Sequence, residues 1–149
     1  MDGRSRCDEN RQVILVDSSV WIDYFRGRQS PETDRLDALV GAERVVTGDL
    51  ILAEVLQGFR ADRDFSRARS LMDAYTVLEL GGPDIALRAA QNFRSLRARG
   101  ITPRKTIDTI IATYCIAHGL TLLFSDRDFE PFVEYLGLES ALPAHGVSI

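Results

Sequence analysis

Short runs of aliphatic residues alternate along the chain with longer segments whose apolar residues recur every three or four positions. Four runs are typical of strands: VILV at 13–16, ERVVTG at 43–48, TVLEL at 76–80 and TLLFS at 121–125. Runs without polar alternation, such as the first and the last, are typical of strands that are buried on both faces, as in a parallel sheet flanked by helices. The pattern therefore predicts a buried sheet assembled from separate parts of the chain.

The segments between these runs have helical periodicity. They are SSVWIDYFRG, PETDRLDALVG, DLILAEVLQGF, RDFSRARSLMDAY, DIALRAAQNFRSLRARG, TIDTIIATYCIAHG and, after the last run, DRDFEPFVEYLG. Pro131 must lie in the first turn of the last helix, because a proline further along would break it. Strands separated by helices predict an α/β fold, a three-layer α/β/α sandwich with right-handed crossovers and a mainly parallel central sheet of about four strands.

Length and composition predict one globular domain. The chain has 149 residues, of which 45% are hydrophobic, enough for a single core. We expect this domain at residues 13–149, after a flexible leader at 1–12, MDGRSRCDENRQ, which lacks the apolar centre of a signal peptide. No stretch approaches the ~20 apolar residues of a membrane span, so no membrane association is expected.

Cysteine and histidine do not provide an obvious basis for chemistry. Cys7 and Cys115 have no metal-ligand spacing, and such sparse cysteine suits a reducing, cytoplasmic location. His118 and His145 have no histidine partner one helical turn away, so we interpret both as structural.

The net charge of −4, from 18 basic and 22 acidic residues, is unlike that of a typical nucleic-acid binder. Its distribution is uneven, however. No acid occurs from residue 85 to residue 107, a window that contains Arg88, Arg94, Arg97, Arg99, Arg104 and Lys105. A one-sign run of this length is consistent with contact to a polyanion and also with an ordinary solvated surface.

Two aspartates follow predicted strands. Asp17 comes directly after the first run, and Asp126 comes directly after TLLFS. Ligands of open α/β sheets bind at the carboxyl ends of the strands, so both positions are candidates for a functional site. For Asp17 alone, capping of the following helix is the alternative interpretation.

Two further acids, Glu54 and Asp108, stand mid-helix among aliphatic neighbours. A buried carboxylate costs several kcal/mol unless it is paired, and pairing with arginine is the alternative for one of them. If the four acids converge, they repel one another, and some would stay protonated unless a cation neutralises them. Oxygen ligands without cysteine or histidine favour Mg²⁺ or Mn²⁺, the ions of phosphoryl-transfer chemistry.

Four blocks of the sequence together resemble the acid-bearing blocks of PIN-domain ribonucleases, in particular the VapC toxins of bacterial toxin–antitoxin pairs. The blocks are VILVDSSVWIDYFRG, LILAEVLQGF, TIDTIIATYCIAHG and TLLFSDRDFEPF. The resemblance assigns metal binding and catalysis to Asp17, Glu54, Asp108 and Asp126. It also implies that Asp128 is a further ligand or support, and that Ser18 supports a ligand or water.

The resemblance implies a Mg²⁺-dependent endoribonuclease, with Mn²⁺ as a substitute, that cleaves RNA with a metal-activated water. Such a chain would be the toxin of a type II toxin–antitoxin system. It would form homodimers and be inhibited in a larger complex by a small VapB-like antitoxin. We expect the basic residues nearest the acids in sequence to contact the RNA backbone: Arg104, Lys105, Arg97 and Arg99.

Three alternatives compete with this hypothesis. A haloacid-dehalogenase-type phosphatase needs an acid two residues after its nucleophile, where this chain has Ser19. A phosphoacceptor receiver domain needs a lysine after a late strand, whereas the single lysine, Lys105, precedes a predicted helix. A PIN fold that only binds its partner, without catalysis, would be expected to lack some of the four acids.

Overall fold

The computed structural model describes residues 12–41 and 44–142. The predicted leader, apart from its last residue, lies outside these ranges, as do Cys7 and His145. The predictions made for them stay predictions.

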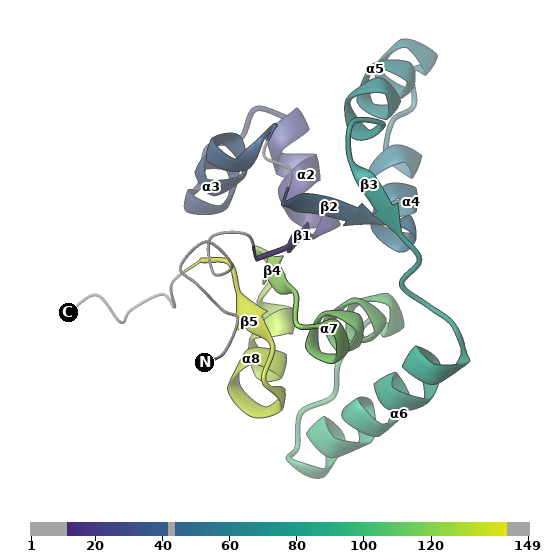
Figure 1. Cartoon of the computed structure of the whole chain (residues 1–149), viewed down its shortest axis with the longest axis vertical. Helices are drawn as coiled ribbons and strands as arrows, with labels where there is room; N and C mark the ends of the chain where they lie inside the picture. Colours follow the sequence, from purple (N-terminus) through teal and green to yellow (C-terminus); the bar gives the residue numbers. More distant parts are fainter. Residues whose placement is uncertain (1–11, 42–43, 143–149) are drawn as a thin grey trace, which may run out of the picture.

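The centre of the molecule is a five-stranded sheet in which every neighbouring pair is parallel, in the order β3-β2-β1-β4-β5 (Figure 1). The strands are β1 (Ile14–Val16), β2 (Val45–Gly48), β3 (Thr76–Leu78), β4 (Thr121–Leu123) and β5 (Glu139–Ser140). The predicted α/β class is confirmed, but the expected count of about four strands was one too low. The fifth strand has two polar residues and forms an edge of the sheet, so it has no apolar run to signal it.

Seven α-helices and one 3₁₀ turn accompany the strands in the described residues. They are α2 (Ser18–Phe25), α3 (Pro31–Leu39), α4 (Asp49–Gln57), α5 (Asp62–Met72), α6 (Pro83–Ala98), α7 (Thr106–His118), the 3₁₀ turn η1 (Arg127–Phe129) and α8 (Glu130–Leu136). Helices α2 to α5 lie on one side of the sheet, and α6 to α8 lie on the other (Figure 1). This arrangement is the predicted three-layer sandwich.

The last predicted helix is divided into two parts. Pro131 lies in the first turn of α8, as expected. The residues before that helix form the 3₁₀ turn η1 instead of further α-helix. The reason is local, because the side chain of Asp126 accepts a hydrogen bond from the backbone N–H of Asp128 and so caps the short turn.

The strand order reverses beside β1. From β1 the chain continues to β2 and β3 on one side, and it returns through α6 and α7 to place β4 and β5 on the other. Ligands of open α/β sheets bind at such a switch point, outside the carboxyl ends of the strands. The backbone N–H of Asp17 donates to the carbonyl of Leu123 at 2.9 Å, so the ends of β1 and β4 are joined directly.

The core surrounds β1, all three residues of which are buried. Trp21 of α2, Ile111 of α7 and Phe129 of η1 are also buried and belong to the same apolar cluster. Elements from both helix layers therefore share one core with β1, the strand that directly precedes Asp17, which fixes the position of this end of the sheet. Among the described residues, no helix combines the length and apolar character needed to cross a membrane.

Candidate metal centre

Asp17 caps a helix and also leaves one carboxylate oxygen unused. Its Oδ2 accepts hydrogen bonds from the backbone N–H of Ser19, at 3.3 Å, and from the Ser19 hydroxyl, at 2.7 Å. Its Oδ1 is buried and has no hydrogen-bond partner among the described residues. The capping interpretation therefore holds for one oxygen, while the other is available to a cation.

Ser19 links Asp17 to Ser125, which lies two residues after the end of β4. The sequence did not reveal this role. The hydroxyl of Ser125 donates to the Ser19 hydroxyl at 3.2 Å, and Ser19 in turn donates to Asp17. The available signal was weak: a hydroxyl residue occurs near the carboxyl end of each of two neighbouring strands. These two hydroxyls connect the segments that carry Asp17 and Asp126.

Glu54 reaches the site from α4, in the helix layer that also contains α2. The hydroxyl of Ser18 donates to Glu54 Oε1 at 3.1 Å. Ser18 was expected to support a ligand or water, and the structure shows that it contacts an acid of the candidate site directly. This contact fixes the side chain of Glu54 against the first turn of α2.

Asp108 comes from the opposite helix layer and lies in the first turn of α7, so its predicted mid-helix position was wrong. The helix begins at Thr106, and the preceding residues, which include Pro103, lie outside it. A carboxylate in the first turn is favoured by the helix dipole. Asp108 is nevertheless buried, and its Oδ2 has no hydrogen-bond partner among the described residues.

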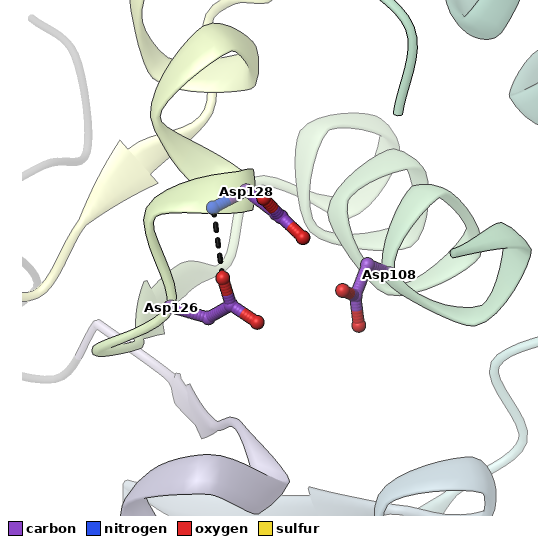
Figure 2. Close-up of side chains that lie close together, drawn as sticks. All are labelled: Asp108, Asp126 and Asp128. Atoms are coloured by element: carbon purple, nitrogen blue, oxygen red, sulfur yellow. Dashed lines mark hydrogen bonds between the residues drawn. The ribbon is translucent and has the colours of Figure 1, made fainter. Parts of the chain in front are cut away.

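Asp126 and Asp128 complete the acidic group from the segment that follows β4. One carboxylate oxygen from each of Asp108, Asp126 and Asp128 lies within 4.8 Å of the others. Figure 2 shows the side chains of Asp126 and Asp128 on the side of their turn that faces Asp108. The backbone N–H of Asp128 donates to Asp126 Oδ1 at 2.9 Å. The other carboxylate oxygen of Asp126, Oδ2, does not take part in this hydrogen bond.

The two basic residues before α7 pair with this segment. Arg104 donates from Nε to Asp128 Oδ2 at 3.3 Å and from Nη2 to Asp128 Oδ1 at 3.1 Å. Lys105 Nζ lies 3.9 Å from Asp126 Oδ2, a longer and weaker ion pair. Both basic side chains are largely exposed, so both also face solvent at the edge of the acidic group.

Arg97 and Arg99 lie at the end of α6, and each stacks over an aromatic ring. The guanidinium carbon of Arg97 is 5.6 Å from the centroid of the Phe93 ring, and that of Arg99 is 4.5 Å from the Tyr135 ring. Both arginines are exposed. The four cations predicted to contact RNA thus occupy two places: the lead into α7 and the end of α6.

The electrostatics couple Asp17, Glu54, Asp108 and Asp126. Burial raises the pKa of Asp17 to about 6, an effect that the Ser19 hydrogen bonds oppose and the charge of Glu54 reinforces. Burial raises the pKa of Asp108 to about 7, and the negative charges of Asp17, Asp126 and Glu54 add to this effect while Lys105 opposes it. The neighbouring negative charges therefore add to burial in destabilising the ionised forms of Asp17 and Asp108.

Cysteine and histidine take no part in this arrangement within the described residues. Cys115 is buried in α7, and burial together with the charge of Asp17 raises the pKa of its thiol to about 12. His118 is exposed at the end of α7, where its ring lies 4.2 Å from the ring of Tyr114. Neither residue has the surroundings of a reactive group.

The residues present fit a hard divalent cation. The donor set consists of carboxylates alone, which suits Mg²⁺ or Mn²⁺ better than zinc. Two of the donors, Asp17 Oδ1 and Asp108 Oδ2, are buried oxygens without a hydrogen-bond partner in the described part of the chain. Cation binding at these oxygens would satisfy them and relieve the repulsion between the acids. The group within 4.8 Å consists of Asp108, Asp126 and Asp128, and it includes neither Asp17 nor Glu54.

Comparison with known proteins identifies the family. A family model for the PIN domain matches residues 14–133. The chain belongs to the PIN-domain family. The PIN domain is also similar to VapC ribonuclease Mb1587 of Mycobacterium bovis, with 28% identity over 131 residues that cover 87% of this chain and 98% of that protein.

Two solved structures share the fold of this PIN domain. VapBC-1 from nontypeable Haemophilus influenzae has a TM-score of 0.66 and 18% identity, with coverage of 86% of this chain and 96% of the other. A toxin–antitoxin complex from Klebsiella pneumoniae has a TM-score of 0.63 and 20% identity, with coverage of 88% and 99%. The resemblance to VapC-type PIN domains drawn from the sequence is confirmed.

The strand order separates this PIN domain from the receiver-domain alternative. Receiver domains have the flavodoxin-like order 2-1-3-4-5, whereas the order here is β3-β2-β1-β4-β5. Lys105 does lie beside an acid, Asp126, but it precedes α7 and does not follow a strand.

Proposed function

We propose that this PIN domain is a Mg²⁺-dependent endoribonuclease that acts in the cytoplasm as the toxin of a type II toxin–antitoxin pair. The observation that carries the proposal is the pair of buried, unpartnered oxygens, Asp17 Oδ1 and Asp108 Oδ2, at the switch point of the sheet. A structural ion pair would have satisfied these oxygens. Similarity to a ribonuclease, VapC ribonuclease Mb1587 of Mycobacterium bovis, supports RNA as the substrate.

In the proposed mechanism Asp17, Asp108 and Asp126 would hold the cation, with Glu54 as a further ligand, directly or through water. The chemistry that Mg²⁺ would supply there is a lower pKa for a bound water and neutralisation of the charge on the departing oxygen of the phosphodiester. Asp17 and Asp108 must be ionised to bind a metal ion. Because their pKa values are raised, metal binding would release the protons that these two carboxyl groups still hold in the metal-free protein. Ser18 and Ser19 hold Glu54 and Asp17 in place through their hydrogen bonds.

The RNA backbone requires cations away from the acids, because the chain carries a net charge of −4. We assign this role to Arg104, Lys105, Arg97 and Arg99, all of which are exposed. Contacts of this kind bind phosphate without reading bases.

Incubation of the purified chain with total RNA tests the proposed activity. We expect cleavage in Mg²⁺ and in Mn²⁺, with discrete ends on mapping, and none in EDTA. Asp17→Asn is the matched control, because asparagine preserves the helix cap but removes the charge. Binding of RNA without cleavage under all these conditions would instead support an inactive PIN-fold binding module.

We further propose a small VapB-like antitoxin as partner, since the Klebsiella pneumoniae structure is described as a toxin–antitoxin complex. The surface of α2 and α5 is the proposed docking region, where Phe65 and Leu71 of α5 are exposed apolar side chains. Co-expression with the adjacent small reading frame should give a stable complex with suppressed nuclease activity. Failure of any adjacent small protein to co-purify would contradict this part of the proposal.

A homodimer is the proposed state of the toxin alone, as the family resemblance implies. Sedimentation equilibrium of the purified chain tests it directly. A monomer at micromolar concentration would contradict the dimer without affecting the proposed chemistry.

A further inference from the structure

Asp128 differs from the other acids in the way its oxygens are used. Its carboxylate lies within the acidic cluster with Asp108 and Asp126, yet both of its oxygens accept hydrogen bonds from Arg104, at 3.1 and 3.3 Å. Asp108 instead has an oxygen without a partner. Distance alone would therefore make Asp128 a metal ligand, whereas its hydrogen bonds show it already engaged.

The Arg104–Asp128 pair has the bidentate geometry that arginine forms with carboxylates. Two parallel N–H···O bonds restrict the orientation of the guanidinium group as well as its position. Of its five N–H donors, Arg104 uses those of Nε and one of Nη2, and Nη1 has no partner among the described residues. The Arg104 side chain is 77% exposed, so these remaining donors are accessible from solvent.

We propose that Asp128 is a positioning residue that holds Arg104 for contact with an RNA phosphate, and that it does not ligate the metal ion. This inference rests on the proposed nuclease function and divides the acids into two groups. Asp17, Asp108 and Asp126 would bind the cation, whereas Asp128 binds the guanidinium group of Arg104.

The alternative, in which Asp128 ligates the cation, requires a less favourable exchange. Each Asp128 oxygen already accepts from Arg104, so ligation by Asp128 would bring the positive guanidinium next to a divalent ion and weaken both hydrogen bonds. Cation binding by Asp17 Oδ1 and Asp108 Oδ2 would weaken no hydrogen bond, because these oxygens have no partner among the described residues. Lys105 contrasts with Arg104, since its single 3.9 Å contact with Asp126 is readily replaced by a bound cation.

The turn η1 links the two groups. Asp126 Oδ1 accepts from the backbone N–H of Asp128 at 2.9 Å, and the side chain of Asp128 accepts from Arg104. The acid proposed to hold the metal therefore also fixes the backbone of the acid that holds the arginine. This chain of contacts sets the position of the phosphate-binding group relative to the reacting phosphate.

The first experiment measures Mn²⁺ affinity by calorimetry in the absence of RNA. The double variant Arg104→Ala/Asp128→Asn removes one positive and one negative charge together, so the net charge near the cation is unchanged. We expect its affinity to stay within about twofold of wild type, while the control Asp108→Asn loses about tenfold or more. A loss in the double variant as large as that of Asp108→Asn would identify Asp128 as a ligand and overturn the inference.

The second experiment measures RNA binding by Asp17→Asn protein, which is not expected to cleave. With Arg104 present, Asp128→Asn should weaken binding by about threefold to tenfold, because the arginine is no longer held. With Arg104→Ala already in place, Asp128→Asn should not weaken binding, since it only removes a negative charge. Equal weakening in both backgrounds, or no weakening in either, would show that Asp128 does not act through Arg104.

Arg88→Ala serves as the charge-matched control, because Arg88 is exposed on α6 beside Thr113, Ile116 and Ala117 of α7, away from the start of that helix. It should leave the effect of Asp128→Asn unchanged. A wild-type chain that binds neither Mn²⁺ nor RNA would overturn the proposed function and this inference with it. Normal Mn²⁺ binding and RNA cleavage by wild type, without coupling between Arg104 and Asp128, would overturn this inference alone.

Discussion

The hydroxyl of Ser18 donates to Glu54 Oε1 at 3.1 Å and joins the first turn of α2 to the middle of α4. It orients a carboxylate whose own helix supplies mainly aliphatic neighbours. Loss of a hydrogen bond to a charged group costs about 1.5–3 kcal/mol, so Ser18→Ala should lower Mn²⁺ affinity and cleavage rate by about tenfold or more. Ser66→Ala, at an exposed position on α5, is the control. Equal effects of the two changes would show that the Ser18 contact has no role in the site.

Asp17→Asn should abolish cleavage and stabilise the metal-free protein. The substitution removes a buried carboxyl group whose pKa is raised to about 6, and asparagine can still cap α2. We expect a melting temperature in EDTA that is several degrees above that of wild type. Asp17→Ala also removes the charge but loses the cap, at a cost of about 1 kcal/mol, and should be less stable than Asp17→Asn. Retained cleavage by Asp17→Asn would refute the assignment of Asp17 to the metal.

The metal-free protein should lose stability as the pH rises. The pKa values of Asp17 and Asp108 are raised from 3.8 to about 6 and about 7, so the folded chain binds more protons than the unfolded chain in that window. The free energy of unfolding therefore falls with increasing pH from about 4 to about 7. Thermal melts in EDTA at about pH 5 and about pH 8 measure the difference.

Mg²⁺ should reduce this pH dependence, because a bound cation favours the ionised carboxylates. Asp108→Asn in EDTA should reduce it as well, since the residue with the higher pKa no longer titrates. A metal-free wild type whose melting temperature rises between these two pH values would contradict the proposed electrostatics of the site.

Gly48→Ala should destabilise the fold next to the site. An added Cβ would lie 2.3 Å from Cδ1 of Leu80, a fully buried side chain, at the junction between β2 and α4. Overpacking of this kind costs about 1–3 kcal/mol, measurable as a lower denaturation midpoint. Gly58→Ala is the matched control at the other end of α4, where the nearest atom would be 3.6 Å away. Equal stability of the two variants would show that Leu80 moves aside without cost.

The salt dependence of RNA binding tests the proposed backbone contacts. In Asp17→Asn protein, alanine at Lys105, Arg97 or Arg99 should weaken binding to unrelated RNAs alike. Each change should reduce the log–log salt slope by about 0.7 per lost contact with a single strand. Arg63→Ala, on the exposed surface of α5, should leave the slope unchanged. An unchanged slope for all three variants would leave them as ordinary surface residues.

The sequence by itself predicted the elements that have strong local signals. Apolar runs located β1, β2, β3 and β4, and Asp17, directly after β1, and Asp126, three residues after the end of β4, were recognisable as acids at the carboxyl edge of a sheet. Four blocks in order were sufficient to recognise the PIN family, which the match to residues 14–133 confirms. These features are readable because hydrophobic periodicity and strand ends are properties of neighbouring residues.

Two local predictions failed, the first because a tertiary contact decided the outcome. β5 consists of Glu139 and Ser140, which have no apolar pattern and are in a strand because β4 offers a free edge. The second concerns Asp108: α7 begins at Thr106, as the predicted segment does, so the first-turn position follows from the helix start and the apolar neighbours were misleading.

Only the tertiary structure decided which oxygens are used and which remain without partners. Ser125 and Ser19 are 106 positions apart in sequence, and Arg104 and Asp128 are 24 apart, yet each pair is hydrogen bonded. The sequence predicted that five acids lie near one edge of the sheet, but it did not predict which of their oxygens accept hydrogen bonds or from which donors. Such pairing depends on distances of a few ångströms between elements of different layers, and folding of the whole chain sets those distances.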